Sequence, residues 1–309
     1  MSSTPDQLPD QWFLFAFDHR DSFRRMVDST DRDTLVTAKS LLFAGFSAAF
    51  TTLPDDIRSN GAAILIDEEY GSPFVAAARA LGARVVMPIE ASGREELAFE
   101  YGDDFAEHIE RFDPDAIKVL LRWDPHGDSM VNGRQGQLLA SLSTWMRANG
   151  RQLIVEFLTP TCEPSTARAE MMAVAVEQIL AAGAEPDVWK VEGLDDTASC
   201  QTVAAAITAG GRDRVRAVVL GRGTTMERAA GWLVAAREVP TFCGFAIGKT
   251  LWKSAMQAHR RGDVDRDEAV AEIARRYVTL IDTWRGVGRS PATSPGNLPR
   301  QPPPITSAG

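Results

Sequence analysis

The sequence has few cysteines, and the three it has are not placed for a shared task. Cys162, Cys200 and Cys243 are odd in number, lie far apart and form no CxxC pair. Disulfide frameworks and thiolate zinc sites need paired or closely spaced cysteines, so the sequence indicates neither of them. We expect the three thiols to be small apolar groups of the core.

Long apolar runs and basic clusters are also missing. No stretch reaches the roughly 18 consecutive apolar residues of a membrane span, and the polar opening MSSTPDQLPD lacks the order of a secretion signal. Asp and Glu outnumber Lys and Arg by 42 to 33 in 309 residues, which gives a formal net charge of −9. We therefore expect a cytoplasmic protein that binds neither nucleic acid, which requires basic surface, nor a membrane.

Two common kinds of cofactor motif are absent as well. No strand-like segment is followed by GxGxxG or GxxxxGK[ST], the phosphate loops of nucleotide-binding sheets. The four histidines, at positions 19, 108, 126 and 259, show no HxH or HExxH spacing, which disfavours a zinc-dependent aldolase.

Short apolar runs rich in Val, Ile and Phe alternate along the chain with longer segments of helical periodicity. The runs are nearly continuous rather than alternating with polar residues, as expected of parallel strands covered by helices on the outside. Eight such units match a (β/α)8 TIM barrel, and the missing nucleotide loops disfavour an open doubly wound sheet. The predicted strands are Trp12–Phe17, Ala62–Asp67, Ala83–Ile89, Ala116–Leu121, Gln152–Leu158, Val188–Glu192, Arg216–Leu220 and Phe242–Ile247.

The segments between these strands predict helices, and the ends of the chain have a different composition. We expect one barrel domain over residues 12–285, a flexible N-terminus over 1–11 and a disordered Pro/Gly/Ser-rich tail over 286–309. The predicted helices are Asp33–Phe50, Pro73–Leu81, Asp104–Phe112, Gly133–Asn149, Thr166–Ala182, Thr197–Ala209, Thr225–Arg237 and Arg266–Trp284.

Three charged residues interrupt the apolar strands themselves. Lys118 lies in AIKVLL, Glu156 in LIVEFL and Lys190 in VWKVE. A buried lysine or glutamate costs several kcal/mol unless it is paired or neutralised. A single buried ion pair that fixes the barrel would explain one such residue, but three on adjacent strands predict a cluster.

Such a cluster suggests Schiff-base chemistry. Two ammonium groups in a poorly solvated place lower the pKa of at least one of them, by desolvation and by mutual repulsion. A neutral amine attacks a carbonyl carbon, and the resulting protonated imine accepts the electrons of a breaking C–C bond. Glu156 can take or return the proton of the hydroxyl next to that bond.

Glycine-rich turns follow the last two predicted strands. Gly221-Arg222-Gly223 comes after the seventh strand and Gly248-Lys249-Thr250 after the eighth. In many barrels these two loops bind phosphate through backbone N–H groups and a helix N-terminus. We therefore expect a phosphate site at Gly221, Arg222, Gly223, Gly248 and Lys249.

Two other functions fit the same residues. Carboxylates at strand ends can hold magnesium in a metal-dependent lyase, with Asp67, Glu68, Glu90, Glu156 and Glu192 as the pool of ligands. A sugar-phosphate sensor without turnover would keep the pocket and lose the chemistry. A Schiff-base enzyme, by contrast, needs neither metal nor cofactor.

The strings AFDHRDSF, LIDEEYG, PIEASG, FEYGDDFAEHIERFDPDAIKVLLRW, PDVWKVEGLD and VLGRG resemble the DUF2090 family. Members of that family are aldolase-like domains, often fused behind 5-dehydro-2-deoxygluconokinase in inositol catabolism. The resemblance runs from about Phe13 to Tyr277. The chain is also distantly similar to the class I tagatose-bisphosphate and sulfofructose-phosphate aldolases, through Asp18, Lys118, Glu156 and Lys190.

The resemblance implies an aldolase for 2-deoxy-5-keto-gluconate 6-phosphate, with dihydroxyacetone phosphate and malonate semialdehyde as products. It gives Lys190 the attack on the C5 ketone and Glu156 the C3 hydroxyl proton, so that the C3–C4 bond breaks. Lys118 is then the cationic neighbour and Asp18 a further catalytic residue. Arg222 and Lys249 hold the phosphate, and Arg20 or Arg122 meets the carboxylate.

Two positions depart from the family pattern. Ala91 stands where a lysine is expected after the strand-three glutamate, and Lys249 stands where an arginine is expected. Both changes bear on which sugar phosphate is accepted. The expected partner is a small sugar phosphate, and since class I barrels of this acidity often associate, a homo-oligomer is an open alternative.

Overall fold

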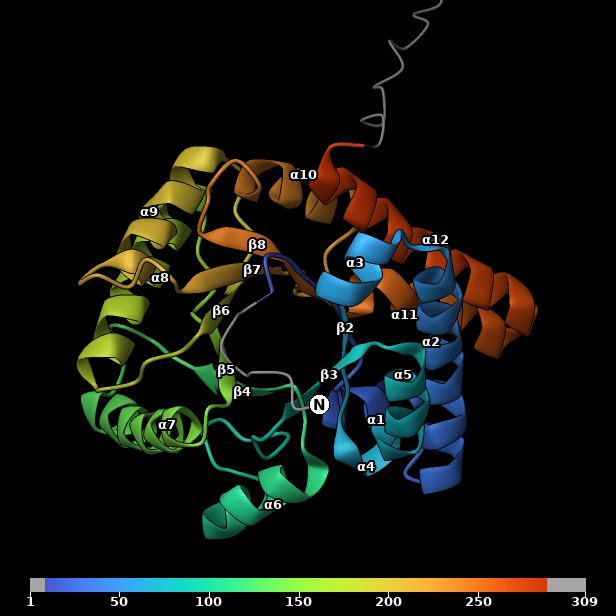
Figure 1. Cartoon of the computed structure of the whole chain (residues 1–309), viewed down its shortest axis with the longest axis horizontal. Coiled ribbons are helices and arrows are strands. Elements are labelled where there is room, and N and C mark those ends of the chain that lie inside the picture. The colour runs from blue at the N-terminus through green and yellow to red at the C-terminus, as the bar shows by residue number, and fades with distance from the viewer. Residues whose placement is uncertain (1–8, 288–309) are drawn as a thin grey trace, which may run out of the picture.

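A computed structural model describes residues 9–287, which form a closed barrel of eight parallel strands. Each strand pairs with the next, and β8 pairs with β1. Helices surround this ring on its outer side (Figure 1). The strands are β1 (Trp12–Ala16), β2 (Ala62–Leu65), β3 (Arg84–Pro88), β4 (Ala116–Arg122), β5 (Gln152–Leu158), β6 (Val188–Glu192), β7 (Arg216–Leu220) and β8 (Phe242–Ile247). The predicted (β/α)8 barrel is confirmed.

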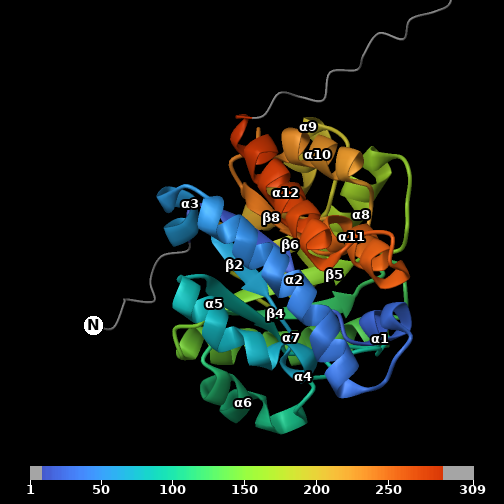
Figure 2. The same cartoon turned by 90° about the vertical axis from the view of Figure 1, so that its right-hand side faces the viewer.

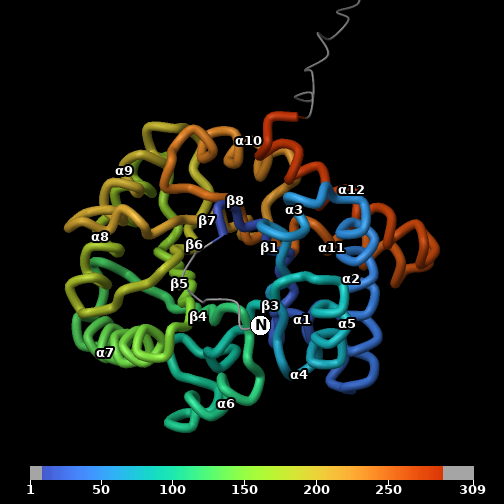
Figure 3. The backbone as a smooth tube through the Cα atoms, viewed as in Figure 1, coloured from blue at the N-terminus to red at the C-terminus, as the bar shows by residue number. Residues whose placement is uncertain are grey.

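The tube in Figure 3 shows the chain passing from inner strand to outer helix around the barrel. The main helices are α1 (Asp21–Val27), α2 (Arg32–Thr52), α3 (Asp55–Asn60), α4 (Glu68–Gly71), α5 (Val75–Leu81), α6 (Phe105–Phe112), α7 (Ser129–Ala148), α8 (Ser165–Ala181), α9 (Thr197–Thr208), α10 (Met226–Ala236), α11 (Lys249–Arg261) and α12 (Arg266–Arg285). Two short 3-10 helices, η1 (Ser72–Phe74) and η2 (Gly102–Asp104), precede α5 and α6.

Most predicted boundaries agree with these elements, and the differences have local causes. The bounds of β5 to β8 are as predicted. Helix α7 begins four residues before the predicted Gly133, because the Asp128 side chain caps it by accepting from the Met130 N–H at 2.8 Å. The predicted flexible N-terminus and disordered tail fall almost entirely outside the described residues.

Helix α11 was not predicted, since Gly248-Lys249-Thr250 was interpreted only as a phosphate loop. Its buried residues Leu251, Trp252, Ala255 and Met256 nevertheless follow a helical spacing, and Gly262 ends it at φ 79°. The barrel therefore has two helices after β8, and the first of them begins at the predicted anion site.

Alternate residues of each strand belong to two separate apolar clusters. In β5, Leu153 and Val155 pack outward against the helices, whereas Ile154 faces the barrel interior. The inner cluster is made of one to three residues from each strand, and Trp12 is its largest member. The two-residue period of a strand therefore turns Glu156 to the inside, directly after Ile154.

Helix α2 is apolar and long, and in the described part of the chain it alone has the length and composition of a membrane span. It packs beside α12 on the outside of the barrel (Figure 2), and its Leu42 and Phe46 are fully buried. The apolar residues of α2 therefore pack in the core of the protein.

Candidate active site

A pocket opens at the C-terminal end of the strands, where the predicted polar residues gather. Asp18 follows β1, Glu90 follows β3, and Lys118, Glu156 and Lys190 project from β4, β5 and β6. Their strand neighbours, such as Ile117 and Val119 beside Lys118, face the helices instead. The alternation of three adjacent strands therefore brings the three predicted charged residues into one pocket.

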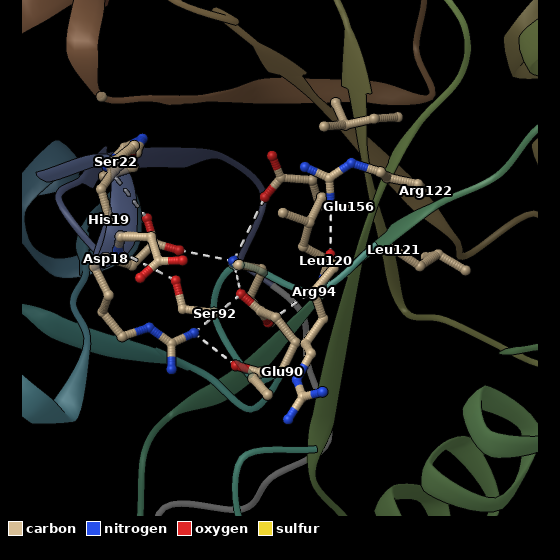
Figure 4. A pocket seen from close by; sticks show the side chains of 18 of the residues that line it. Asp18, His19, Ser22, Glu90, Ser92, Arg94, Leu120, Leu121, Arg122 and Glu156 are labelled. Atoms are coloured by element: carbon tan, nitrogen blue, oxygen red, sulfur yellow. Dashed lines mark hydrogen bonds and ion pairs between the residues drawn. The ribbon is translucent and has the colours of Figure 1, made fainter. Parts of the chain in front are cut away.

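Lys118 lies at the centre of three carboxylates. Its Nζ is 2.7 Å from Asp18 Oδ2, 2.7 Å from Glu90 Oε1 and 3.6 Å from Glu156 Oε2. In Figure 4 the side chains of Asp18, Glu90 and Glu156 point toward one another in the pocket. The Lys118 residue is only 2% exposed.

The neighbouring charges shift the pKa values of Lys118 and Asp18. Burial alone would lower the pKa of Lys118, but the carboxylates of Asp18, Glu90 and Glu156 outweigh it and raise this pKa above its ordinary range. Burial would likewise raise the pKa of Asp18, yet the positive charge of Lys118 holds it far below the usual value. The predicted lowering of the pKa of at least one of the two lysines does not occur at Lys118, because anions and not a second ammonium are its nearest neighbours.

Lys190 has a different environment from Lys118. Its Nζ donates to Glu156 Oε2 at 2.8 Å and forms no other ion pair with the described residues. The pairing of β5 with β6 sets Glu156 beside Lys190 in register. One carboxylate oxygen of Glu156 is thus shared by two lysines, at 2.8 Å from Lys190 and 3.6 Å from Lys118.

The predicted phosphate loops lie together at the β7 and β8 side of the pocket. Arg222, Gly223, Gly248 and Lys249 line it, whereas the predicted Gly221 is not among the lining residues. A Cβ built on Gly223 would be 3.9 Å from the Cβ of Lys249, so the two loops are in contact. Gly248 precedes α11, whose N-terminus offers free N–H groups and a positive dipole end.

The two cations of this region differ in their partners. Arg222 adopts a left-handed backbone (φ 45°) and its guanidinium is ion-paired with Glu192. Lys249 is half-buried and forms no ion pair with any described residue, and burial lowers its pKa. An uncompensated, partly buried ammonium beside free N–H groups is suited to an anion.

The two arginines predicted to meet a carboxylate also line the pocket. Arg20 is buried and occupied by the protein itself, since it donates to the Glu90 carbonyl at 2.6 Å and to Glu100 Oε2 at 3.1 Å. Arg122 is half exposed and donates to the Arg94 carbonyl at 2.9 Å. Of the two, Arg122 has more donors left for a ligand.

The residue that the sequence interpretation most undervalued is Glu90. It was considered only as a magnesium ligand, although it lies two residues past the end of β3, as Asp18 lies two residues past the end of β1. His19 also lines the pocket, where burial lowers its pKa to about 3 and keeps the ring neutral. Two further arginines, Arg25 and Arg94, line the mouth without forming an ion pair with described residues.

Of the five carboxylates in the proposed magnesium pool, only Glu90 and Glu156 come together, around Lys118. Asp67 pairs with Lys39 in the core, Glu68 contacts His108 at 2.6 Å, and Glu192 pairs with Arg222. Over residues 9–287 the structure contains no group of three or more His, Cys, Asp or Glu side chains arranged to hold a metal ion.

Fold and site together define a (β/α)8 barrel that carries a buried cluster of lysines and carboxylates at its C-terminal mouth. The chain belongs to the family described as "Uncharacterized protein conserved in bacteria (DUF2090)", which matches residues 1–288. The resemblance seen in the sequence is thereby confirmed. A comparison with curated proteins finds no match.

Solved structures with the same fold include a fructose-bisphosphate aldolase from Plasmodium falciparum, in complex with TRAP and a small-molecule inhibitor. It has a TM-score of 0.68 and 15% identity, with 93% of this chain and 94% of that chain covered. A second, Cgl0159 from Corynebacterium glutamicum, has a TM-score of 0.57 and 17% identity, with 88% of each chain covered. The likeness to both lies in the fold alone.

Proposed function

We propose that this protein is a class I aldolase that cleaves a sugar phosphate through a Schiff base on Lys190. The observation that carries the proposal is the 2.8 Å hydrogen bond from Lys190 to a glutamate, beside a second lysine held as a cation by Asp18 and Glu90. This pairs a nucleophile with its proton acceptor, as covalent catalysis by an amine requires.

The steps follow from these contacts. Lys190 passes a proton to Glu156 and attacks the ketone carbon, and Glu156 returns the proton as the carbinolamine loses water. Glu156 then takes the proton of the hydroxyl next to the C–C bond that will break, on the part of the substrate that leaves as the aldehyde. The C–C bond then breaks and an aldehyde leaves. The electron pair of the broken bond moves into the iminium, which becomes an enamine. Protonation and hydrolysis of the enamine release the second product and restore Lys190.

Lys118 serves this reaction without being consumed. Its charge is fixed by neighbouring carboxylates, so it can stabilise the oxyanion that develops when the hydroxyl proton leaves. Asp18, 2.7 Å away, holds it in place.

The substrate that we propose is 2-deoxy-5-keto-gluconate 6-phosphate, as members of this family imply. Lys249, the glycine loops and Arg222 would hold the phosphate, and Arg122 rather than the occupied Arg20 would meet the carboxylate. On this proposal the partner is a small sugar phosphate, and the reaction belongs to inositol catabolism in the cytoplasm.

Borohydride trapping tests the proposal. Incubation with dihydroxyacetone phosphate and borohydride should add the mass of the reduced triose phosphate to Lys190, and EDTA should not prevent it. Lys190→Met should remove the adduct, whereas Lys253→Met, which changes an exposed lysine of α11, should keep it.

Other outcomes identify the competing functions. Absence of an adduct together with turnover that EDTA abolishes would establish a metal-dependent lyase. Binding of the sugar phosphate without any adduct or cleavage would establish a sensor. Either result overturns the Schiff-base proposal.

A further inference from the structure

We infer that Glu90 is a positioning residue for this reaction, which keeps the Lys118 ammonium away from Glu156 so that Glu156 remains the partner of Lys190. The inference rests on the proposed function. Glu90 does not touch Lys190, so its effect must pass through Lys118.

Glu90 is held from several sides. The Glu90 residue is 7% exposed. Its Oε1 accepts from Lys118 at 2.7 Å, and its Oε2 accepts from the Leu120 N–H at 3.1 Å. Its carbonyl accepts from Arg20 at 2.6 Å. The donor Leu120 lies on β4 two residues beyond Lys118, so one strand aligns both oxygens of the carboxylate (Figure 4).

The geometry divides the anions between the two lysines. Lys118 takes Asp18 and Glu90 at 2.7 Å each, and Glu156 only at 3.6 Å. The same oxygen of Glu156 is 2.8 Å from Lys190. Two ammonium groups therefore compete for one oxygen, and the close contacts of Lys118 with Asp18 and Glu90 together favour Lys190.

A glutamine at position 90 cannot replace the carboxylate. Both oxygens of Glu90 face N–H donors, from Lys118 and from Leu120. An amide has a single acceptor oxygen, and its NH2 group would face whichever donor that oxygen does not serve. Besides losing the negative charge, Glu90→Gln therefore leaves one buried donor without an acceptor. After Asp18, which Lys118 already contacts, Glu156 is the nearest carboxylate to which this ammonium can turn.

The experiment compares the rate of borohydride-trapped adduct formation with dihydroxyacetone phosphate in the wild type and Glu90→Gln. We expect the variant to be about 10- to 100-fold slower, at or below the lower end of proton-transfer effects, because Glu156 itself is still present. Its affinity for inorganic phosphate, measured by calorimetry, should stay unchanged because Glu90 lies across the pocket from the glycine loops. Glu90→Asp keeps the charge and two acceptor oxygens, and should recover part of the rate.

A double-mutant cycle separates positioning from a structural role. In a Lys118→Met background no ammonium is left to divert Glu156, so adding Glu90→Gln should not slow the trapping further. An equal slowing in both backgrounds, or an unchanged rate in Glu90→Gln alone, overturns the inference while the aldolase proposal stands. If the wild type itself forms no adduct, the proposed function fails and the inference fails with it. Should Glu90→Gln not fold, the Glu90→Asp rate and the same cycle with Glu90→Asp decide the matter.

Discussion

Lys39 is a third enclosed lysine of this molecule, and it lies outside the pocket. It projects from α2, donates to the Phe17 carbonyl at 2.7 Å and is ion-paired with Asp67, and both side chains are fully buried. The rings of Phe17, Phe23 and Tyr70 lie 5.2–5.9 Å from its ammonium. Because Phe17 directly precedes Asp18, this lysine secures the end of β1 where the site begins.

Removing this ammonium should expose the cost of a buried unpaired carboxylate. We expect Lys39→Met to lower the free energy of unfolding by about 3–5 kcal/mol, measured by urea denaturation. Adding Asp67→Asn should restore part of the loss, since an amide oxygen can still accept from the Tyr70 N–H as Asp67 Oδ1 does at 2.8 Å. A single variant as stable as the wild type would show that the pair contributes nothing.

Strand β8 closes the barrel through a glycine. Gly244 pairs with Trp12 of β1 and has φ 146°, and a Cβ built there would lie 2.0 Å from the Trp12 carbonyl oxygen. A side chain at position 244 would fit only if β1 and β8 moved apart. The seam between the last and the first strand therefore depends on this residue.

Gly244→Ala should destabilise the protein by about 3 kcal/mol, from backbone strain and overpacking combined. Gly231→Ala is the matched control, because Gly231 lies within α10 and a Cβ added there would meet nothing within 4 Å. That change should raise stability by about 0.5–1 kcal/mol. Thermal unfolding of the two variants checks the contrast, and a similar loss in both would contradict it.

The sequence predicts the elements better than it predicts their contacts. Charged residues inside apolar strands are visible in one dimension, which is why Lys118, Glu156 and Lys190 could be selected. The stagger between neighbouring strands is not visible, and it decides that Glu156 lies level with Lys190 and that Glu90 reaches Lys118. For the same reason the sequence could not show which lysine is surrounded by carboxylates, and the structure gives that place to Lys118.

At the scale of the whole molecule, charge is distributed unevenly. The chain carries a net charge of −9, yet Arg25, Arg94 and Lys249 stand at the pocket mouth without an ion pair to described residues. An anionic ligand is thus repelled by the surface in general and attracted at one place. The pKa of His19 is lowered mainly by burial. The charge of Lys249 lowers it further, and the charge of Asp18 opposes both effects.

His19 gives stability a definite dependence on pH. Its pKa is about 3 in the folded protein against an ordinary 6.5, so below pH 6.5 the unfolded chain binds a proton that the folded protein does not. Its contribution is complete above pH 6.5 and is lost progressively as the pH falls toward 3. We expect wild-type stability to fall by about 1 kcal/mol per pH unit relative to His19→Gln over this window, measured by urea unfolding. Parallel curves for the two proteins would contradict the assignment.

The alternation along β4, β5 and β6 constrains how a chain of this kind can diversify. Lys118, Glu156 and Lys190 face the interior only because each is an even number of residues from an inward neighbour, namely Ala116, Ile154 and Val188. Inserting or deleting one residue within a strand would turn its charged group to the helices. Glu156 could then no longer lie between Lys118 and Lys190. Changes of length are therefore restricted to the loops, where they can alter what enters the pocket while leaving the cluster of lysines and carboxylates intact.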